Sequence, residues 1–214
     1  MGYKGRITGI TFVAIIIIVI RTFVKLNFGE TPHGIPLPAS ILMIVGWYLG
    51  REYDKSVYKA NRDSLTGLFN RRYVLDNIQK SFSKAKRKRN KLAIILLDVN
   101  DFKQINDNLG HETGDQVLKC ISDLLIDSFA SEDIVARWGG DEFLIVSSFT
   151  DETMLNQKVS HFKGSIKGKH WRHNGLSVSI GKAIYPSDDK TFESLISKAD
   201  ANMYRFKSYH NSNT

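Results

Sequence analysis

Acidic residues stand at two places where the sequence could bind a divalent cation. Asp98 ends an apolar run, and Asp141 and Glu142 follow two consecutive glycines. If the segment that contains the glycines pairs beside the apolar run, we expect the three carboxylates to converge at one edge of a sheet. Carboxylates without an accompanying His or Cys are the ligands that Mg²⁺ prefers. The glycines permit a sharp turn and the close approach of a bulky ligand.

The same residues have a plain structural interpretation. Asp and Gly are common in tight turns, so a Gly-Gly-Asp sequence taken alone is more typical of an ordinary hairpin than of a metal site. The choice between the two therefore depends on the elements around the turn and on further motifs.

Apolar periodicity predicts the elements that must position the acids. We expect a helix over 74–82, a strand over 91–99, a helix over 117–129, strands over 133–138 and 143–148 around a turn at 139–142, a helix over about 151–165, a strand pair within 176–186 and a helix from about 193. Strands alternate with helices and one hairpin is present. The pattern therefore predicts an α+β domain with a mixed central sheet flanked by helices.

The first fifty residues differ in kind from the rest. Residues 7–20 carry no charge, and 35–50 form a second apolar run with Trp47 and Tyr48 near its end. We interpret these runs as two transmembrane helices joined by a short polar loop. Basic residues precede the first run and follow the second, which predicts that both chain ends lie on the cytoplasmic side of a membrane.

The distribution of charge agrees with a membrane rather than a nucleic acid polymer as partner. Residues 1–62 contain eight Lys or Arg and three acidic residues, whereas 63–214 contain 22 and 19. The excess of positive charge therefore lies mainly beside the apolar runs. Two alternatives stay open: the first run could be a cleaved signal peptide, or both runs could form a soluble hairpin. The expected organisation is a hairpin over 1–50, a linker helix over 51–62 and a compact α+β domain over 63–214.

The hairpin Gly139-Gly140-Asp141-Glu142-Phe143 resembles the signature of the GGDEF family of diguanylate cyclases. Other family motifs are matched in the expected order, and the resemblance covers roughly residues 60–210. These are Asp63-x-Leu65-Thr66-Gly67-Leu68-x-Asn70-Arg71, the segment from Asp98 to Asp107 with Gly110-His111 and Gly114-Asp115, Ser179-Ile180-Gly181, and Ala199-Asp200-x-x-Met203-Tyr204-x-x-Lys207.

The resemblance implies a palm-like, nucleotidyl-cyclase-type domain that condenses two GTP molecules into cyclic di-GMP with release of pyrophosphate. Asp98, Asp141 and the Val99 carbonyl would hold two Mg²⁺ ions per active site, with Mn²⁺ as a possible substitute. Glu142 would be a further ligand or the base for the attacking 3′-hydroxyl. Asp141 and Glu142 are accordingly the implied catalytic residues.

The resemblance also implies a substrate site and a homodimer. Asn106 and Asp115 would read guanine, because a carboxylate accepts from N1–H and the 2-amino group and an amide donates to O6. The backbone at Phe102 and Lys103 would cradle the phosphates, and Lys207 would hold the terminal ones. Because each site binds one GTP and the product contains two nucleotides, two copies of the chain must face each other.

The sequence departs from the family pattern at a few positions. Asn100 replaces a common Asp. At the family's inhibitory product site, Ala130 stands where an Arg is expected and Asp133 is retained, so we predict that this site is absent. Asn211 stands where a second phosphate-binding Arg is expected. This loss keeps open a runner-up function, a membrane signalling protein whose GGDEF-like domain binds nucleotide without turnover.

Overall fold

The computed structural model of the chain describes residues 3–29, 37–129, 132–167, 170–171 and 174–211. Two compact units are present, Met1–Asn61 and Arg62–Thr214.

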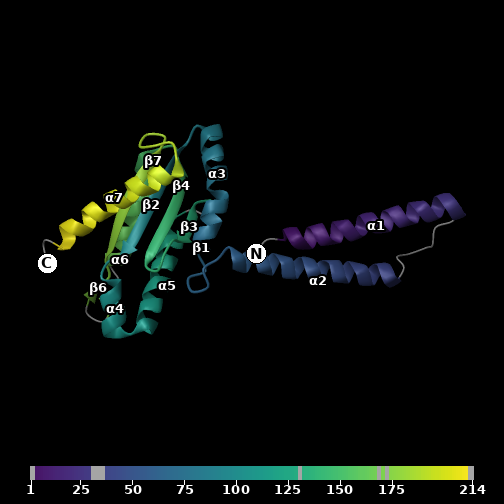
Figure 1. Cartoon of the computed structure of the whole chain (residues 1–214), viewed down its shortest axis with the longest axis horizontal. Helices are drawn as coiled ribbons and strands as arrows, with labels where there is room; N and C mark the ends of the chain where they lie inside the picture. Colours follow the sequence, from purple (N-terminus) through teal and green to yellow (C-terminus); the bar gives the residue numbers. More distant parts are fainter. Residues whose placement is uncertain (1–2, 30–36, 130–131, 168–169, 172–173, 212–214) are drawn as a thin grey trace. The chain divides into compact units, whose positions relative to one another are not determined.

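The first unit is a pair of helices, α1 (Lys4–Phe28) and α2 (Leu37–Ala60), which lie side by side (Figure 1). Glycines allow the two backbones to touch: Gly9 lies against Gly46, and a Cβ added at Gly5 would come within 2.6 Å of the Gly50 carbonyl oxygen. These contacts show that the helices run antiparallel. Residues 51–60 of the segment expected as a linker helix are helical and continue α2 without a break from the apolar segment.

A buried carboxylate of α2 closes the N-terminal end of α1. Asp54 accepts hydrogen bonds from the backbone N–H of Gly5 (2.7 Å) and of Arg6 (3.3 Å), and it forms an ion pair with the Arg6 guanidinium (3.5 Å). The first N–H groups of a helix have no partner within the helix. Asp54 therefore caps α1 from the neighbouring helix.

By length and composition, α1 is the one helix among the described residues that could cross a membrane. Its most apolar window has a mean hydropathy of 2.5, and none of that window is buried, unlike the core helix of a soluble protein. A signal sequence near the N-terminus would satisfy the same criterion. The second predicted span does not satisfy it, because α2 becomes charged after Gly50.

The second unit contains a five-stranded sheet with the order β1-β3-β4-β2-β7. The strands are β1 (Phe69–Asn70), β2 (Lys91–Val99), β3 (Ile134–Arg137), β4 (Glu142–Phe149) and β7 (Val178–Tyr185). β1 pairs with β3 in parallel and the other pairs are antiparallel, so the sheet is mixed. The predicted α+β class is confirmed.

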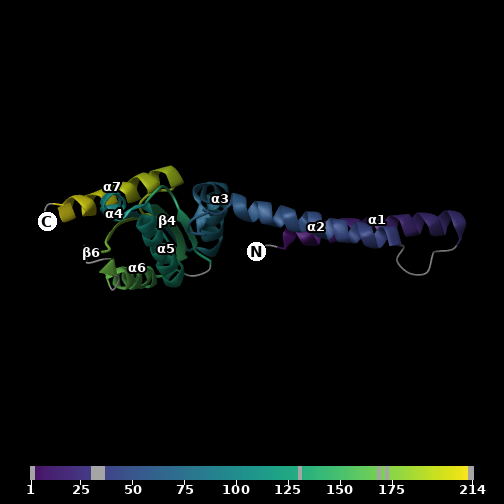
Figure 2. The ribbon, with the colours of Figure 1, turned by 90° about the horizontal axis from the view of Figure 1, so that it is seen from below.

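Helices cover both faces of the sheet. The helices α5 (His111–Ser128) and α6 (Glu152–Lys167) lie on the face opposite α7 (Phe192–Asn211) (Figure 2), and α3 (Arg71–Lys88) packs on the α7 side. Alternate residues of β2 enter the two cores: Leu97 packs with the α5 side and Leu96 with the α7 side. Coverage on both faces explains why the strand reads as a continuous apolar run.

Several predicted boundaries were wrong for local physical reasons. Glu142 was expected in the turn but is the first residue of β4, because it pairs with Asp98 on the central strand. The first domain helix extends to Lys88, since Lys and Arg are good helix formers and are favoured at a helix C-terminus. The strand pair expected within 176–186 is the single strand β7, preceded by a ribbon of β5 (His170–Trp171) and β6 (Asn174–Gly175).

Candidate active site at the hairpin turn

The strand register places the predicted acids at one end of the sheet. Asp98, near the end of β2, lies opposite Glu142 of β4 on one side and Ser179 of β7 on the other. Directly opposite residues project from the same face of a sheet. Since Leu96 and Leu144 pack on the α7 side, Asp98 and Glu142, two positions along their strands, face that side too. Asp98 is only 8% exposed.

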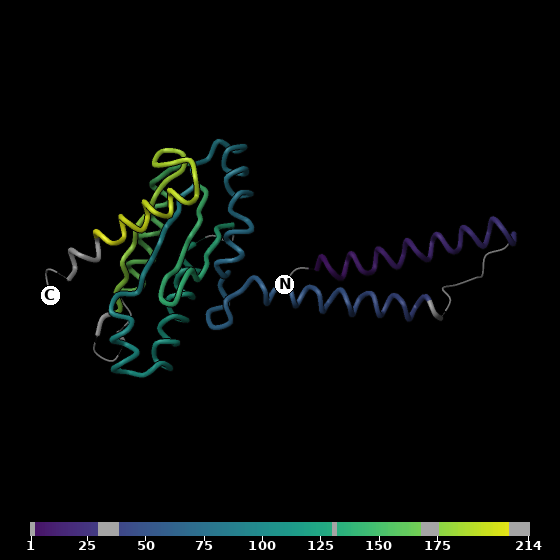
Figure 3. Tube along the Cα trace, in the orientation of Figure 1, coloured from purple at the N-terminus to yellow at the C-terminus, as the bar shows by residue number. Residues whose placement is uncertain are grey.

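The turn between β3 and β4 is tied to the end of β2. The Val99 N–H donates to the Asp141 carbonyl (3.2 Å), and the N–H groups of Trp138 and Gly139 donate to the Glu142 carbonyl (2.8 and 3.2 Å). A Cβ at Gly139 would lie 2.6 Å from Glu142 Oε2, so a larger residue there would displace that carboxylate. Figure 3 shows the turn at the end of the sheet where β2 runs into the helix α4 (Phe102–Leu109).

The described residues include no group of three His, Cys, Asp or Glu side chains that could hold a metal ion by themselves. The arrangement instead offers neighbouring carboxylates beside main-chain carbonyl groups. This donor set fits Mg²⁺, which is usually bound by one or two carboxylates and completes its shell with substrate phosphates and water.

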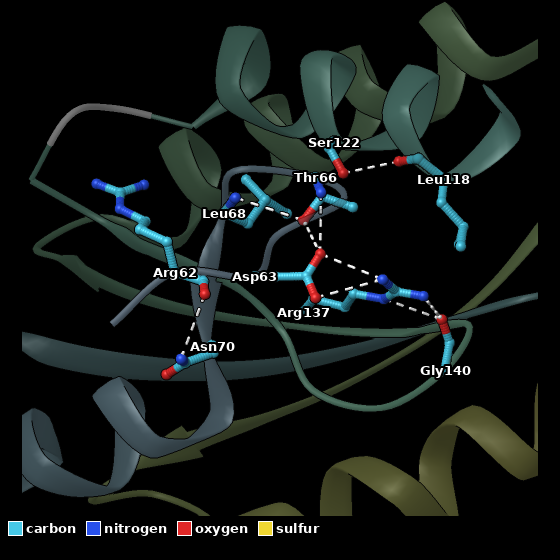
Figure 4. A network of polar contacts seen from close by, with 9 residues as sticks. All are labelled: Arg62, Asp63, Thr66, Leu68, Asn70, Leu118, Ser122, Arg137 and Gly140. Atoms are coloured by element: carbon cyan, nitrogen blue, oxygen red, sulfur yellow. Dashed lines mark hydrogen bonds and ion pairs between the residues drawn. The ribbon is translucent and has the colours of Figure 1, made fainter. Parts of the chain in front are cut away.

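An arginine that the sequence reasoning missed fixes the turn. Arg137 donates from Nη2 and Nε to the Gly140 carbonyl (2.7 and 3.1 Å) and from Nη1 to both carboxylate oxygens of Asp63 (3.2 and 3.3 Å) (Figure 4). One guanidinium therefore joins the first residues of the domain to the glycine turn. Its place at the end of a predicted strand, two residues before the glycines, was the signal that could have identified it.

Asp63 is held by a local loop as well as by Arg137. It accepts from the Thr66 N–H (2.9 Å) and the Thr66 hydroxyl (2.8 Å). Gly67, at φ 71°, closes the loop by donating to the Asp63 carbonyl (3.0 Å). Burial alone would raise the pKa of Asp63, but the hydrogen bonds from Thr66 and Arg137 outweigh it and hold the pKa below its ordinary value.

The two predicted guanine-reading residues lie on adjacent helices, α4 and α5. Gly114, which precedes Asp115, packs against Asn106: a Cβ at Gly114 would lie 3.0 Å from Asn106 Cγ and 3.3 Å from Phe102 Cζ. The absence of a side chain at Gly114 thus lets Asn106 approach the start of α5. Asp115 is exposed.

The predicted phosphate cradle is the N-terminus of α4. Asp101 precedes this helix in the left-handed conformation (φ 55°), and Phe102 and Lys103 occupy its first turn. The N–H groups of a first helical turn have no partner within the helix and attract anions.

Comparison with known proteins identifies the domain. Residues 60–213 match the family model described as diguanylate cyclase, GGDEF domain. The chain belongs to the GGDEF family. It is 35% identical over 154 residues to the diguanylate cyclase DosC of Escherichia coli K12, covering 70% of this chain and 33% of DosC. It is 32% identical over 158 residues to the diguanylate cyclase DgcS of Shewanella oneidensis, covering 73% of this chain and 52% of DgcS.

A solved structure agrees with the assignment. The GGDEF domain of TpbB (YfiN) from Pseudomonas aeruginosa superimposes with a TM-score of 0.65 at 31% identity, over 69% of this chain and 89% of that one. The chain spans between about a third and about half the length of the two curated relatives. The match therefore establishes the GGDEF domain, and the activity of the whole protein is a proposal.

Three residues of the predicted nucleotide and product sites lie wholly or partly outside the described structure. Ala130 lies outside the described residues, and Lys207 and Asn211 lie in α7 with side chains outside the description. Asp133 is 7% exposed and accepts from Lys158 Nζ of α6 at 2.7 Å. The retained acid of the product-site pattern is therefore already paired with a cation of its own domain.

Proposed function

We propose that this chain is a diguanylate cyclase that condenses two GTP molecules into cyclic di-GMP and releases pyrophosphate. The observation that carries the proposal is the pairing of Asp98 with Glu142 beside the glycine turn of a GGDEF domain. That pairing puts two of the proposed acidic residues opposite each other on neighbouring strands, which supports a metal-assisted phosphoryl transfer.

Asp98, Asp141 and the Val99 carbonyl are the proposed ligands of two Mg²⁺ ions, which Mn²⁺ can replace. When bound, such ions favour deprotonation of the 3′-hydroxyl and neutralise charge at the α-phosphate. Glu142 adds a further ligand or takes the proton from that hydroxyl. The donor set consists of oxygen atoms only, as these cations prefer.

The substrate residues follow from the same comparison. Asn106 and Asp115 read the guanine edge, a role supported by the packing of Asn106 against Gly114. The first turn of α4, at Phe102 and Lys103, and Lys207 of α7 bind the phosphates. Two copies of the chain face each other during the reaction, because one site holds one GTP and the product joins two.

We propose further that residues 1–50 anchor the protein in a bacterial inner membrane, that 51–62 link the anchor to the catalytic domain, and that this domain, residues 63–214, is cytoplasmic. The apolar helix α1, with no buried part in its most apolar window, supports the anchor. The second crossing proposed for α2 rests on the apolar run over 35–50 and on the antiparallel pairing of α2 with α1; among the described helices only α1 meets the length and composition criterion for a span.

The test of the activity is to incubate the purified full chain with GTP and Mg²⁺ and to separate the products by chromatography. We expect cyclic di-GMP from the wild type and from the control Asp123→Ala, an exposed acid of α5, and none from Asp141→Ala. Equal synthesis by a folded Asp141→Ala protein would refute the two-metal assignment. GTP binding without turnover by the wild type would identify the runner-up function, which the loss of the expected Arg at Asn211 favours.

A further inference from the structure

Asn100 links the end of the central strand to the edge strand β7. The paired register of β2 and β7 ends at Val99 and Val178, yet the contact continues one residue further. The Asn100 N–H donates to the Ser177 carbonyl at 3.1 Å. The chain is therefore still held to β7 at the point where it leaves the strand.

The Asn100 side chain holds the two serines that flank Val178. Its Oδ1 accepts from the Ser179 hydroxyl at 2.7 Å, and its Nδ2 donates to Ser177 Oγ at 3.0 Å. Ser179 is 4% exposed, so its hydroxyl needs a partner inside the protein. An amide can accept and donate at the same time, which suits this double contact.

These bonds fix the direction of the Val99 carbonyl. That carbonyl shares one peptide unit with the Asn100 N–H, and the two groups of a planar trans peptide point in opposite directions. Because the N–H points to Ser177, the residue directly before β7, the Val99 carbonyl points away from that side, toward β4 and the glycine turn. The Val99 N–H, which donates to the Asp141 carbonyl at 3.2 Å, points to the same side.

We infer that Asn100, through Ser177 and Ser179, is a positioning residue for the divalent-cation site: it holds the Val99 carbonyl toward the turn without adding a charge beside Asp98. The inference rests on the proposed function, since it assumes that the Val99 carbonyl is a metal ligand. A carboxylate at position 100 would also accept from both serine hydroxyls, but it would bring a further negative charge. Asn100 therefore sets both the geometry of the site and its affinity for the cation.

The experiment measures Mn²⁺ binding to the full chain purified in detergent, from the electron paramagnetic resonance signal of free Mn²⁺. We expect Asn100→Ala to lower the affinity by about ten-fold or more, the usual effect of losing a residue that orients a metal ligand. Ser177→Ala should also lower the affinity for Mn²⁺, because it removes the hydroxyl oxygen that accepts from Asn100 Nδ2. Asn100→Asp should raise the affinity above that of the wild type. Asn108→Ala, an exposed amide of α4, is the matched control and should bind as the wild type does.

The outcomes separate this inference from the proposed function. If Asp98→Asn leaves Mn²⁺ affinity unchanged, the proposed metal site itself is wrong. If Asp98→Asn lowers the affinity while both Asn100→Ala and Ser177→Ala bind like the wild type, the positioning role is overturned and the metal site stands. A lowered affinity in Asn100→Asp would also overturn the inference. Should Asn100→Ala not fold, Ser177→Ala and Asn100→Asp give the decision.

Discussion

Removing the guanidinium of Arg137 should loosen the turn that carries Asp141 without touching any proposed ligand. In Arg137→Gln the Gly140 carbonyl loses two hydrogen bonds and Asp63 loses its ion pair. Asp63 keeps its two bonds from Thr66, so the local loop should stay formed. We therefore expect a folded protein whose turn is less well positioned.

The cost in stability follows from the burial of the pair. The side chains of Arg137 and Asp63 are 18% and 21% exposed, so the contact is neither a surface pair nor fully buried. Hydrogen bonds to charged groups contribute about 1.5–3 kcal/mol, and partial exposure reduces this to about 1–2 kcal/mol. For a domain of this size that corresponds to a fall in melting temperature of about 2–8 °C. Arg72→Gln is the control, because Arg72 and Asp76 are 75% and 60% exposed and such a pair contributes about 0.5 kcal/mol or less.

The assay compares cyclic di-GMP synthesis and thermal unfolding of the wild type, Arg137→Gln and Arg72→Gln. A small displacement of reacting groups can cost up to about a hundred-fold in rate, so we expect Arg137→Gln to be roughly ten- to hundred-fold slower at a temperature where it is folded. Full activity of a folded Arg137→Gln protein would refute the claim that Arg137 positions the turn.

The same variant should change how stability depends on pH. The pKa of Asp63 is lowered in the folded state, so its contribution is present above the unfolded pKa of about 3.9 and is lost as pH falls through the lower folded value. Chemical unfolding between neutral and acidic pH should therefore show less loss of stability below about pH 4 in Arg137→Gln than in the wild type. Identical pH profiles would contradict this.

Three further predictions concern recognition, regulation and location. Asp115→Ala should weaken GTP binding and discrimination against ATP, because paired hydrogen bonds to guanine are lost; calorimetry with both nucleotides checks this, and unchanged values exclude the residue. Added cyclic di-GMP should not slow synthesis by the wild type, because Ala130 supplies no hydrogen-bond donor and Asp133 is paired with Lys158. Ala130→Arg should introduce inhibition by the product. Saturable non-competitive inhibition of the wild type would contradict this prediction. The full chain should stay with membranes after alkaline extraction through α1 (Lys4–Phe28), and recovery in the supernatant would remove the anchor.

The sequence predicted the elements whose patterns are local and strong. The β2 strand was predicted from a run of apolar residues that is buried on both faces, and the antiparallel hairpin from the glycine turn between two short strands. The order of strands across the sheet could not be obtained in this way. The edge strand β1 has only two residues, Phe69 and Asn70, and its parallel pairing with β3 depends on packing of the completed domain.

The candidate site, like the fold, could be predicted from the sequence only in part. The proposed ligands are acids in a recognisable motif, and residue type alone pointed to them. Arg137 and Asn100 act through contacts with residues 74 and 77 to 79 positions away, so no spacing in the sequence reveals their partners. The sequence shows only that Asn100 replaces a common Asp, whereas the structure shows the two serines that it joins.

Three hydrogen bonds hold the backbone around Val99 and the glycine turn, and in each of them the acceptor is a main-chain carbonyl group. The Asp141 carbonyl accepts from Val99, the Gly140 carbonyl accepts from Arg137, and the Ser177 carbonyl accepts from Asn100. Each of these hydrogen bonds fixes the position of the backbone that carries a proposed metal ligand. Loss of one of these hydrogen bonds should therefore misplace a metal ligand rather than remove it. The rate of cyclic di-GMP synthesis and the affinity for the cation should then fall together, while nucleotide binding through Asn106 and Asp115 is retained. A variant of Arg137 or Asn100 that lost GTP affinity but kept its affinity for Mn²⁺ would show that these residues serve the nucleotide pocket instead.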